Sequence, residues 1–277
     1  MNTNDNLKDT AREIRCDVIH SIAHLGVGHI GGCLSVVELM TVLYFEAMSI
    51  DPKNPKMEGR DRFISSKGHA GPAVYAALAN RGYFDKSVLL TLNQGGTKLP
   101  SHCNMRLTPG IDMTTGSLGQ GFSCAVGAAL GAKIAKDGAR VYTLLGDGEC
   151  QEGQIWEAAM FAAAKRLDNL IGFVDVNRFQ IDGTVAEVND VEPLADKWAA
   201  FGWNVIDVPK GNDVEAVSAA VKQAKANLGG GKPTMVLLRT VKGCGMKWAE
   251  DLGPANHNVA VPMEEAEAAI RALREEA

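Results

Sequence analysis

Two neighbouring stretches decide the fold: residues 141–159, VYTLLGDGECQEGQIWEAA, and residues 170–183, LIGFVDVNRFQIDG. Each begins with a short run of branched and apolar residues and then turns abruptly polar or glycine-rich. The segment between the two runs, Glu152 to Arg166, has the composition of a helix. A strand, a helix and a second strand in this order form a βαβ unit, which places the two strands parallel in one sheet.

The same alternation continues towards the C-terminus. Two further apolar runs, Trp203 to Val208 and Thr234 to Arg239, predict strands, and Leu194 to Phe201 and Asp213 to Leu228 predict helices. Continuous apolar runs are typical of strands buried on both faces. The sequence therefore predicts an α/β fold, with a doubly wound, mainly parallel sheet flanked by helices.

The first part of the chain, residues 1–135, has a different pattern and is expected to be mostly helical. A first helix is expected to end at Gly26, and Ala70 to Arg81 predicts another. Ser35 with Glu38 three residues later is a capping-box pattern, which predicts a helix starting at Ser35. Gln120 to Lys136 is small and apolar nearly all round and predicts a buried helix. With a last helix from Pro262 to Glu275, we expect residues 1–277 to form a single domain.

Composition limits the function. The chain has 277 residues, 46% of them hydrophobic, and 28 Lys and Arg against 33 Asp and Glu, for a net charge of -5. This balance does not favour nucleic acid or an anionic membrane as a partner. No apolar run approaches the length of a membrane span and the N-terminus does not resemble a signal peptide, so we expect a cytoplasmic protein. The six cysteines are widely spaced, without a CxxC pair, and are expected to be reduced thiols.

The polar residues that follow the first two strands predict a binding site. Asp147 follows the first strand and Asn177 the second, 30 residues later, so both should reach the same edge of the sheet. A carboxylate, an amide oxygen and a backbone carbonyl form half of an oxygen shell suited to Mg²⁺. Gly146 and Gly148 would let phosphate groups approach the backbone, and the following helix would direct its N-terminus towards them.

With these motifs the sequence resembles the thiamine-diphosphate enzymes, and among them the transketolases. The family's diphosphate motif, GDG followed by Asn, is matched by GDGECQEGQIWEAA and DVNRFQIDG. Further matches are RDRFISSKGHAGPAVYAALANRGYF (60–84), LPSH (99–102), TPGIDMTTGSLGQG (108–121) and TVKGCG (240–245), in the family's order. The chain is most similar to the separate N-terminal subunit of a split transketolase, the half that carries the diphosphate-binding domain.

The resemblance implies specific roles for individual residues. Asp147, Asn177 and the carbonyl of Phe179 would bind Mg²⁺, or another divalent cation such as Ca²⁺ or Mn²⁺. The residues implied to contact thiamine diphosphate are Gly148, Glu149 and Asn177 at the diphosphate, Ile181 at the thiazolium ring, and the backbone of Gly116, Ser117 and Leu118 at the aminopyrimidine. Ser117 replaces a common proline, which matters little where only main chain makes the contact.

Three histidines match the active-site histidines of the family. The resemblance implies that His69 binds the diphosphate, whereas His29 and His102 face the reacting carbons. Imidazole suits such roles because it titrates near neutrality. The residues after His29 and His102, Ile30 and Cys103, replace usual prolines. His257 is the one candidate for a further family histidine, although its Trp-His-Gly context is missing. Lys242 could contact an anion or be solvated.

The implied activity is transfer of a two-carbon ketol unit from a ketose or ketose phosphate to an aldose. The pyrimidine-binding half of the enzyme is missing from this chain, so a C-terminal partner subunit is expected, in an α2β2 assembly. Glu152, as a catalytic residue, and Glu157 match acidic positions at the family's subunit interface. Two alternatives are the α-subunit of a 2-oxoacid dehydrogenase and a cofactor-free interaction subunit. The GxGxxG pattern of residues 26–31 follows a helix and not a strand, which argues against dinucleotide binding.

Overall fold

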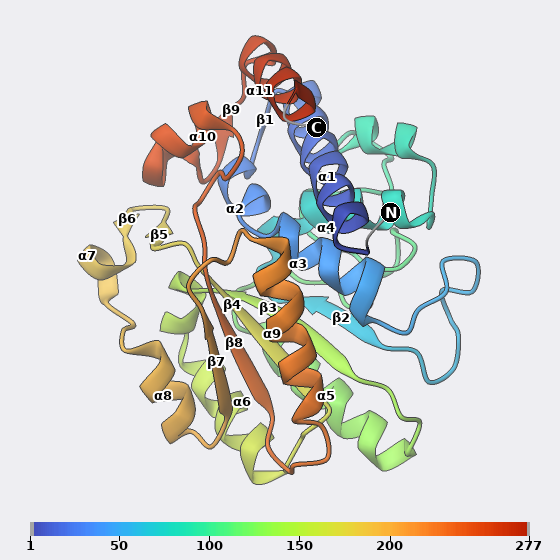
Figure 1. Cartoon of the computed structure of the whole chain (residues 1–277), viewed down its shortest axis with the longest axis vertical. Helices are drawn as coiled ribbons and strands as arrows, with labels where there is room; N and C mark the ends of the chain where they lie inside the picture. The colour runs from blue at the N-terminus through green and yellow to red at the C-terminus, as the bar shows by residue number, and fades with distance from the viewer. Residues whose placement is uncertain (1–2, 276–277) are drawn as a thin grey trace.

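The computed structural model describes residues 3–275 and has a central five-stranded sheet (Figure 1). All neighbouring strands are parallel, as predicted. Their order across the sheet is β2 (Arg62–Ser65), β3 (Val141–Gly146), β4 (Leu170–Val176), β8 (Thr234–Arg239) and β7 (Asn204–Val208). The predicted bounds of β4 and β8 are confirmed, whereas the short strand β2 was not predicted.

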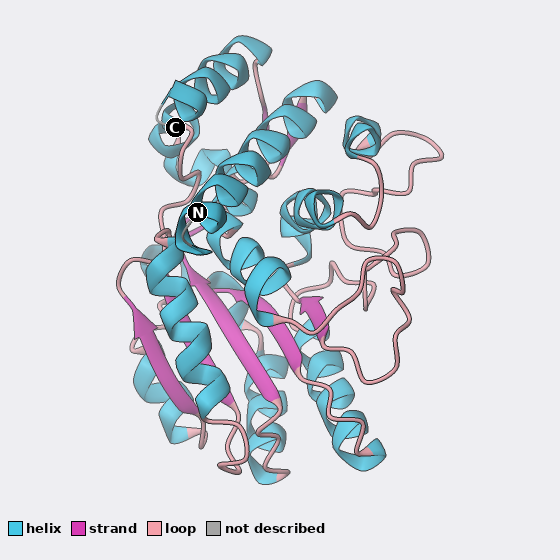
Figure 2. Ribbon diagram, turned by 45° about the vertical axis from the view of Figure 1, so that its right-hand side comes forward, coloured by secondary structure: helices cyan, strands magenta, loops and turns pink. Residues whose placement is uncertain are grey.

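Helices cover both faces of the sheet (Figures 1 and 2). One face carries α1 (Thr3–Leu25), α3 (Val37–Val42), α4 (Gly71–Arg81) and α9 (Val214–Ala226), and the other carries α5 (Gln120–Ala135), α6 (Gly153–Ala164) and α8 (Leu194–Ala200). The two-residue period of β3 divides its side chains between the faces: Tyr142 and Leu144 lie in the first core, Val141 and Leu145 in the second. The α/β architecture predicted from the alternating strands and helices is confirmed.

The remaining elements are short, apart from one C-terminal helix. They are the antiparallel pair β1 (Val27–Gly28) and β9 (Val259–Ala260), the hairpin β5 (Phe179–Gln180) and β6 (Gly183–Thr184), helices α2 (Ile30–Leu34), α7 (Val185–Asn189), α10 (Lys247–Asp251) and α11 (Met263–Glu275), and the single turns η1 (Leu43–Ala47), η2 (Gly68–Ala70), η3 (Lys86–Thr91), η4 (Gly148–Gln151) and η5 (Gly253–Asn256). Within 3–275, no helix is both long enough and apolar enough to span a bilayer.

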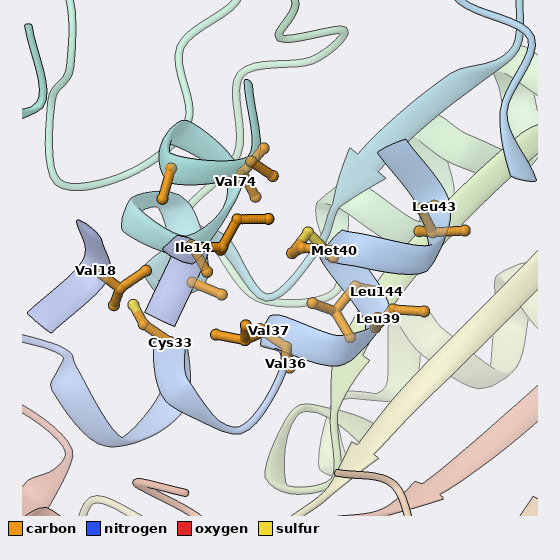
Figure 3. Packing of buried hydrophobic residues seen from close by; sticks show 14 of the residues in the cluster. Ile14, Val18, Cys33, Val36, Val37, Leu39, Met40, Leu43, Val74 and Leu144 are labelled. Carbon is orange, nitrogen blue, oxygen red and sulfur yellow. The ribbon is translucent and has the colours of Figure 1, made fainter. Parts of the chain in front are cut away.

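The larger core joins the N-terminal helices to the sheet. Ile14 of α1, Met40 of α3 and Val74 of α4 point towards one another, with Leu144 of β3 beside them (Figure 3). All four side chains are buried. This packing places the loops that precede α2 and α4 above the carboxyl ends of the strands.

The capping-box prediction is wrong. The helix begins at Val37, and its N-cap residue, Val36, has no side-chain cap. Ser35 Oγ instead donates to Asp175 Oδ2 at 2.6 Å, and Glu38 Oε1 accepts from Arg15 Nη2 at 2.7 Å. Both side chains are thus taken up by partners that are distant in sequence, which a local pattern cannot reveal.

The prediction that Gln120 to Lys136 forms a buried helix holds for only one face of α5 in the isolated chain. Phe122, Ala125 and Ala129 pack into the second core, but Ile134 is 74% exposed and Gly127 lies on the open side. The helix is apolar on a face that nothing in residues 3–275 covers.

Candidate active site

The carboxyl ends of β3 and β4 bring the predicted metal ligands together. Gly146 pairs with Asp175 in the parallel register, so Asp147 and Asn177 emerge from adjacent strands at one edge. Asp147 Oδ2 accepts from the backbone N–H of Arg178 at 2.5 Å, and Oδ1 accepts from that of Gly148 at 2.8 Å. The bond from Arg178 links the two loops directly, whereas the bond from Gly148 lies within the loop after β3.

A cavity of about 460 Å³ lies above this edge, a size typical of small-molecule sites. All the predicted site residues except Ser117 line it, namely His29, His69, His102, Gly116, Leu118, Asp147, Gly148, Glu149, Glu152, Asn177, Phe179, Ile181 and His257. Lys67 and Lys242 line it as well. The structure therefore brings together residues from segments that are widely separated along the chain.

The donor set at the strand ends fits a hard cation. Asp147 is only 3% exposed, and burial, with the nearby Asp175 carboxylate, raises its pKa to about 7. The Asn177 amide nitrogen donates to Asp175 Oδ2 at 2.7 Å, and its oxygen accepts from the Phe179 N–H at 3.1 Å. Among residues 3–275, no three side chains of His, Cys, Asp or Glu lie together as a metal site. The predicted ligand set would not form such a group, because Asp147 is its only member of these residue types. A carboxylate, an amide oxygen and a carbonyl suit Mg²⁺.

Glu149 lines the cavity, but its carboxylate is taken up by hydrogen bonds within the protein. Its Oε1 accepts from the Gly119 N–H at 2.9 Å and from Ser66 Oγ, and its Oε2 accepts from the Gly146 N–H at 3.0 Å. The carboxylate thus ties the loop before α5 to the end of β3. Because both oxygens are occupied, a contact between Glu149 and a diphosphate would come from its main chain.

Four histidine rings meet on one side of the cavity. The ring centroid of His29 lies 5.4 Å from that of His69, 5.6 Å from His102 and 5.4 Å from His257, and His69 lies 4.9 Å from His257. Burial, followed by the neighbouring imidazoles and lysines, lowers the pKa of His29 to about 4 and that of His257 to about 3. Burial also lowers the pKa values of His69 and His102. The cluster is neutral at pH 7 and can both donate and accept hydrogen bonds.

His257 reaches the cluster by a route that the sequence does not show. Val27 pairs with Ala260 and Gly28 with Val259 in the short β1–β9 ladder. This ladder sets the segment after η5 beside the loop that carries His29. The ring of His257 therefore joins the other three although the Trp-His-Gly context is missing.

The two lysines of the cavity differ in their partners. Lys67 Nζ contacts Asp175 Oδ2 at 2.5 Å and donates to the Gly32 carbonyl at 2.7 Å, so its charge is neutralised inside the protein. Lys242 is only 3% exposed, and its Nζ lies 3.4 Å from His257 Nδ1. Burial and the Lys67 charge lower the pKa of Lys242 to about 8. Lys242 can therefore offer its ammonium group to an anion, a function that its sequence context left open.

The rim of the cavity is exposed and partly apolar. Ile181, at the tip of the β5–β6 hairpin, is 69% exposed, and Leu118 is also exposed. Glu152, at the N-terminus of α6, and Glu157, one turn further on, are exposed. These residues form an open edge at which another protein surface could complete the site.

Comparison with known proteins identifies the family. The family described as "Transketolase, thiamine diphosphate binding domain" matches residues 6–275. The chain belongs to the transketolase family. It is 53% identical, over 98% of its length and 97% of the other's, to the 6-deoxy-6-sulfo-D-fructose transketolase subunit SqwG of Clostridium sp. (strain MSTE9). It is 40% identical, over 90% and 86% of the two lengths, to one of the subunits of the apulose-4-phosphate transketolase of Phocaeicola vulgatus.

Solved transketolases share the fold. A transketolase from Leishmania mexicana superimposes with a TM-score of 0.88 and 32% identity, and a variant from Pichia stipitis with a TM-score of 0.90 and 31% identity. Each match covers 96% of this chain but only 41% and 40% of the solved chains, respectively. The chain therefore spans about two fifths of a full-length transketolase and corresponds to an N-terminal subunit of this thiamine-diphosphate-dependent family.

The GxGxxG pattern of residues 26–31 follows α1 directly, contains the two residues of β1 and ends inside α2, which begins at Ile30. The strand that a dinucleotide site needs before the pattern is not there. This glycine-rich stretch carries His29, whose side chain lines the cavity.

Proposed function

We propose that this chain is the diphosphate-binding subunit of a split transketolase, a single domain that needs a C-terminal partner subunit to transfer a two-carbon ketol unit from a ketose to an aldose. The observation that carries the proposal is the joint placement of Asp147, Asn177 and four histidines around one cavity. A cofactor-free interaction subunit would have no use for a buried carboxylate at this edge.

The residues fit thiamine diphosphate with a divalent cation. Asp147, Asn177 and the Phe179 carbonyl would hold Mg²⁺, Ca²⁺ or Mn²⁺, and Lys242 and His69 would offer hydrogen bonds to the diphosphate oxygens. When bound, thiamine diphosphate supplies the carbanion chemistry needed to break and form the carbon–carbon bond. The chain itself would orient this group and screen its charge.

Three of the histidines would contact the sugar substrate and exchange protons with its hydroxyl groups. His29, His102 and His257 are neutral at pH 7 because burial lowers their pKa values. A neutral imidazole can accept a proton from a sugar hydroxyl and return it. Their position on one side of the cavity leaves the other side for the strand-end ligands.

The exposed rim supports a partner subunit. Glu152 and Ile181 lie at this rim, and the uncovered faces of α5 and α6 expose Ile134, Met160 and Phe161. Exposed apolar side chains on adjacent helices are typical of protein interfaces. We expect the partner to contribute the pyrimidine-binding half, Glu152 to meet an acidic group across the interface, and the complex to be a cytoplasmic α2β2 assembly.

The relatives suggest an anionic sugar as the substrate. One relative acts on 6-deoxy-6-sulfo-D-fructose and another on apulose 4-phosphate, according to their names. A terminal sulfonate or phosphate is common to both. We therefore propose a ketose with an anionic terminal group as the donor, and assays with 6-deoxy-6-sulfofructose and fructose 6-phosphate would distinguish the two groups.

Reconstitution tests the proposed function. The chain co-purified with its partner should transfer a ketol unit in the presence of thiamine diphosphate and Mg²⁺, whereas the chain alone should not. In isothermal titration of the complex, Asp147→Ala should abolish cofactor binding, and the exposed Asp196→Ala on α8 should leave it unchanged. Robust transfer by the isolated chain, or normal cofactor affinity in Asp147→Ala, would overturn the proposal. Activity with pyruvate in place of a ketose would favour a 2-oxoacid dehydrogenase.

A further inference from the structure

The loop that carries Lys242 is held by two side chains and one backbone carbonyl from residues that do not line the cavity. The Val241 N–H donates to Asn212 Oδ1 at 2.7 Å, and the Gly243 N–H donates to the Gly31 carbonyl at 3.0 Å. The Cys244 carbonyl accepts from Arg15 Nε at 2.9 Å. The backbones of Val241, Gly243 and Cys244 are thus each held by a residue from a different part of the chain.

Asn256 completes this arrangement at Lys242 itself. Its side chain is fully buried, and its Nδ2 donates to the Lys242 carbonyl at 3.3 Å and to the Ala249 carbonyl at 2.7 Å. Asn256 also directly precedes His257. One side chain therefore joins the segment that carries Lys242 to the segment that carries His257.

Because Gly31 has no side chain, the Asn256 amide can pack directly against its backbone. A Cβ atom built on Gly31 would lie 2.0 Å from Asn256 Oδ1, far inside van der Waals contact. The Oδ1 atom has no hydrogen-bond partner within residues 3–275. A buried amide oxygen without a partner is unfavourable by itself. The two hydrogen bonds that Nδ2 donates must therefore offset this cost and hold the Asn256 side chain in place.

We propose that Asn256 is a positioning residue that sets the place of the Lys242 ammonium group and of the His257 ring in the cavity. This inference rests on the proposed function only for the identity of the anion that Lys242 meets. The 3.4 Å separation between Lys242 Nζ and His257 Nδ1 is the geometry that Asn256 would maintain. Without the amide, nothing else that we find in residues 3–275 ties the Lys242 carbonyl to the turn before His257.

The test measures how accessible the Lys242 amine is. Reductive methylation of the full-length chain at pH 8, quantified by peptide mass spectrometry relative to the other lysines, should show Lys242 protected in the wild type. In Asn256→Ala we expect its reaction rate to rise roughly fivefold or more, because loss of the two bonds lets the buried loop open more often. Asn256→Asp keeps the volume but removes the donor and should behave in the same way.

Asn169 provides a matched control. It also donates through Nδ2 to two carbonyls, those of Ala129 and Ala139, and its Oδ1 is likewise buried without a partner within 3–275. It directly precedes β4, at the opposite end of the sheet from the cavity. Asn169→Ala should therefore lower the melting temperature without changing the labelling of Lys242.

Gly31→Ala tests the same contact from the other side. The added methyl group should displace the Asn256 amide and raise Lys242 labelling as Asn256→Ala does, and the double variant should be no worse than either single variant. This variant also decides the question if Asn256→Ala does not fold. Equal Lys242 labelling in the wild type, Asn256→Asp and Gly31→Ala would overturn the positioning role.

Cofactor binding separates this inference from the proposed function. In the complex with its partner, Asn256→Asp should weaken the affinity for thiamine diphosphate roughly tenfold while Asn169→Ala leaves it unchanged. Absence of binding by the wild-type complex would refute the proposed function alone, because the labelling of Lys242 would still decide the role of Asn256. Unchanged affinity in Asn256→Asp would refute the positioning role.

Discussion

The histidine cluster makes the stability of the chain depend on pH in a predictable direction. Burial lowers the pKa of His29 to about 4 and that of His257 to about 3. The unfolded chain binds these protons at a higher pH, near about 6.5. A base with a lowered folded-state pKa contributes stability that is present above the unfolded pKa and is lost as the pH falls towards the folded value. Each cluster histidine should therefore destabilise the fold between about pH 6.5 and pH 4.

The magnitude follows from the pKa difference. A fall from pH 6.5 to pH 5.0 lies wholly above the folded pKa of His257 and corresponds to about 2 kcal/mol for a fully buried group. His257 is partly exposed, so solvent screening reduces this to about 1 kcal/mol. Asp147 acts in the opposite direction: its pKa is raised to about 7, so its protonation stabilises the fold over the same interval. The net pH profile of the wild type therefore does not isolate the histidines.

A comparison of variants does isolate them. In His257→Gln the Asp147 contribution remains, so the difference in free energy of unfolding between wild type and variant should shift by about 1 kcal/mol in favour of the variant between pH 6.5 and pH 5.0. Urea unfolding followed by tryptophan fluorescence measures this difference. His20→Gln, on the exposed side of α1, is the control substitution. A difference for His257→Gln that stays constant across the interval would refute the reasoning.

Three further predictions concern the ion pair, the rim and α5. Lys67→Met should destabilise the chain by about 3–5 kcal/mol in urea unfolding, because it leaves the buried Asp175 carboxylate unpaired. The double variant with Asp175→Asn should recover part of this loss, and an additive loss would contradict the pairing. Glu152→Gln should lower ketol transfer by the complex about 100-fold without changing the melting temperature of the isolated chain, since Glu152 is exposed; full activity would exclude a catalytic role. Gly121→Ala should cost about 1–3 kcal/mol, because its Cβ would lie 2.6 Å from Ser66 Cα. Gly127→Ala, on the open side of the same helix, should stabilise the chain by about 1 kcal/mol. If Gly121→Ala proved the more stable of the two variants in urea unfolding, the close contact with Ser66 would not be what requires glycine at position 121.

The sequence alone was sufficient for most of the sheet. Strands β4 and β8 begin and end where the apolar runs do, because strands buried on both faces leave a continuous signal. Strand β2 is an edge strand of four residues and leaves no such signal. The placement of Asp147 beside Asn177 also followed from the sequence, since it depends only on the order of strands.

What the sequence could not provide depends on contacts between distant segments. The Ser35 and Glu38 side chains match a local capping pattern, but Asp175 and Arg15 bind them in the folded chain. Lys242 could not be distinguished from a solvated lysine until its burial was known. Similarly, the composition of α5 indicates that both of its faces need cover, but it does not say that only one of them is covered within this chain.

The β1–β9 ladder has a consequence for the timing of assembly. It pairs residues next to His29 with residues next to His257, which come from opposite ends of the sequence. During synthesis, a nascent chain on the ribosome would complete its sheet and most of its helices while the cavity still lacks one wall. The cavity can close only after the segment around Val259 has emerged, so occupation of the site would report that the β1–β9 ladder has formed.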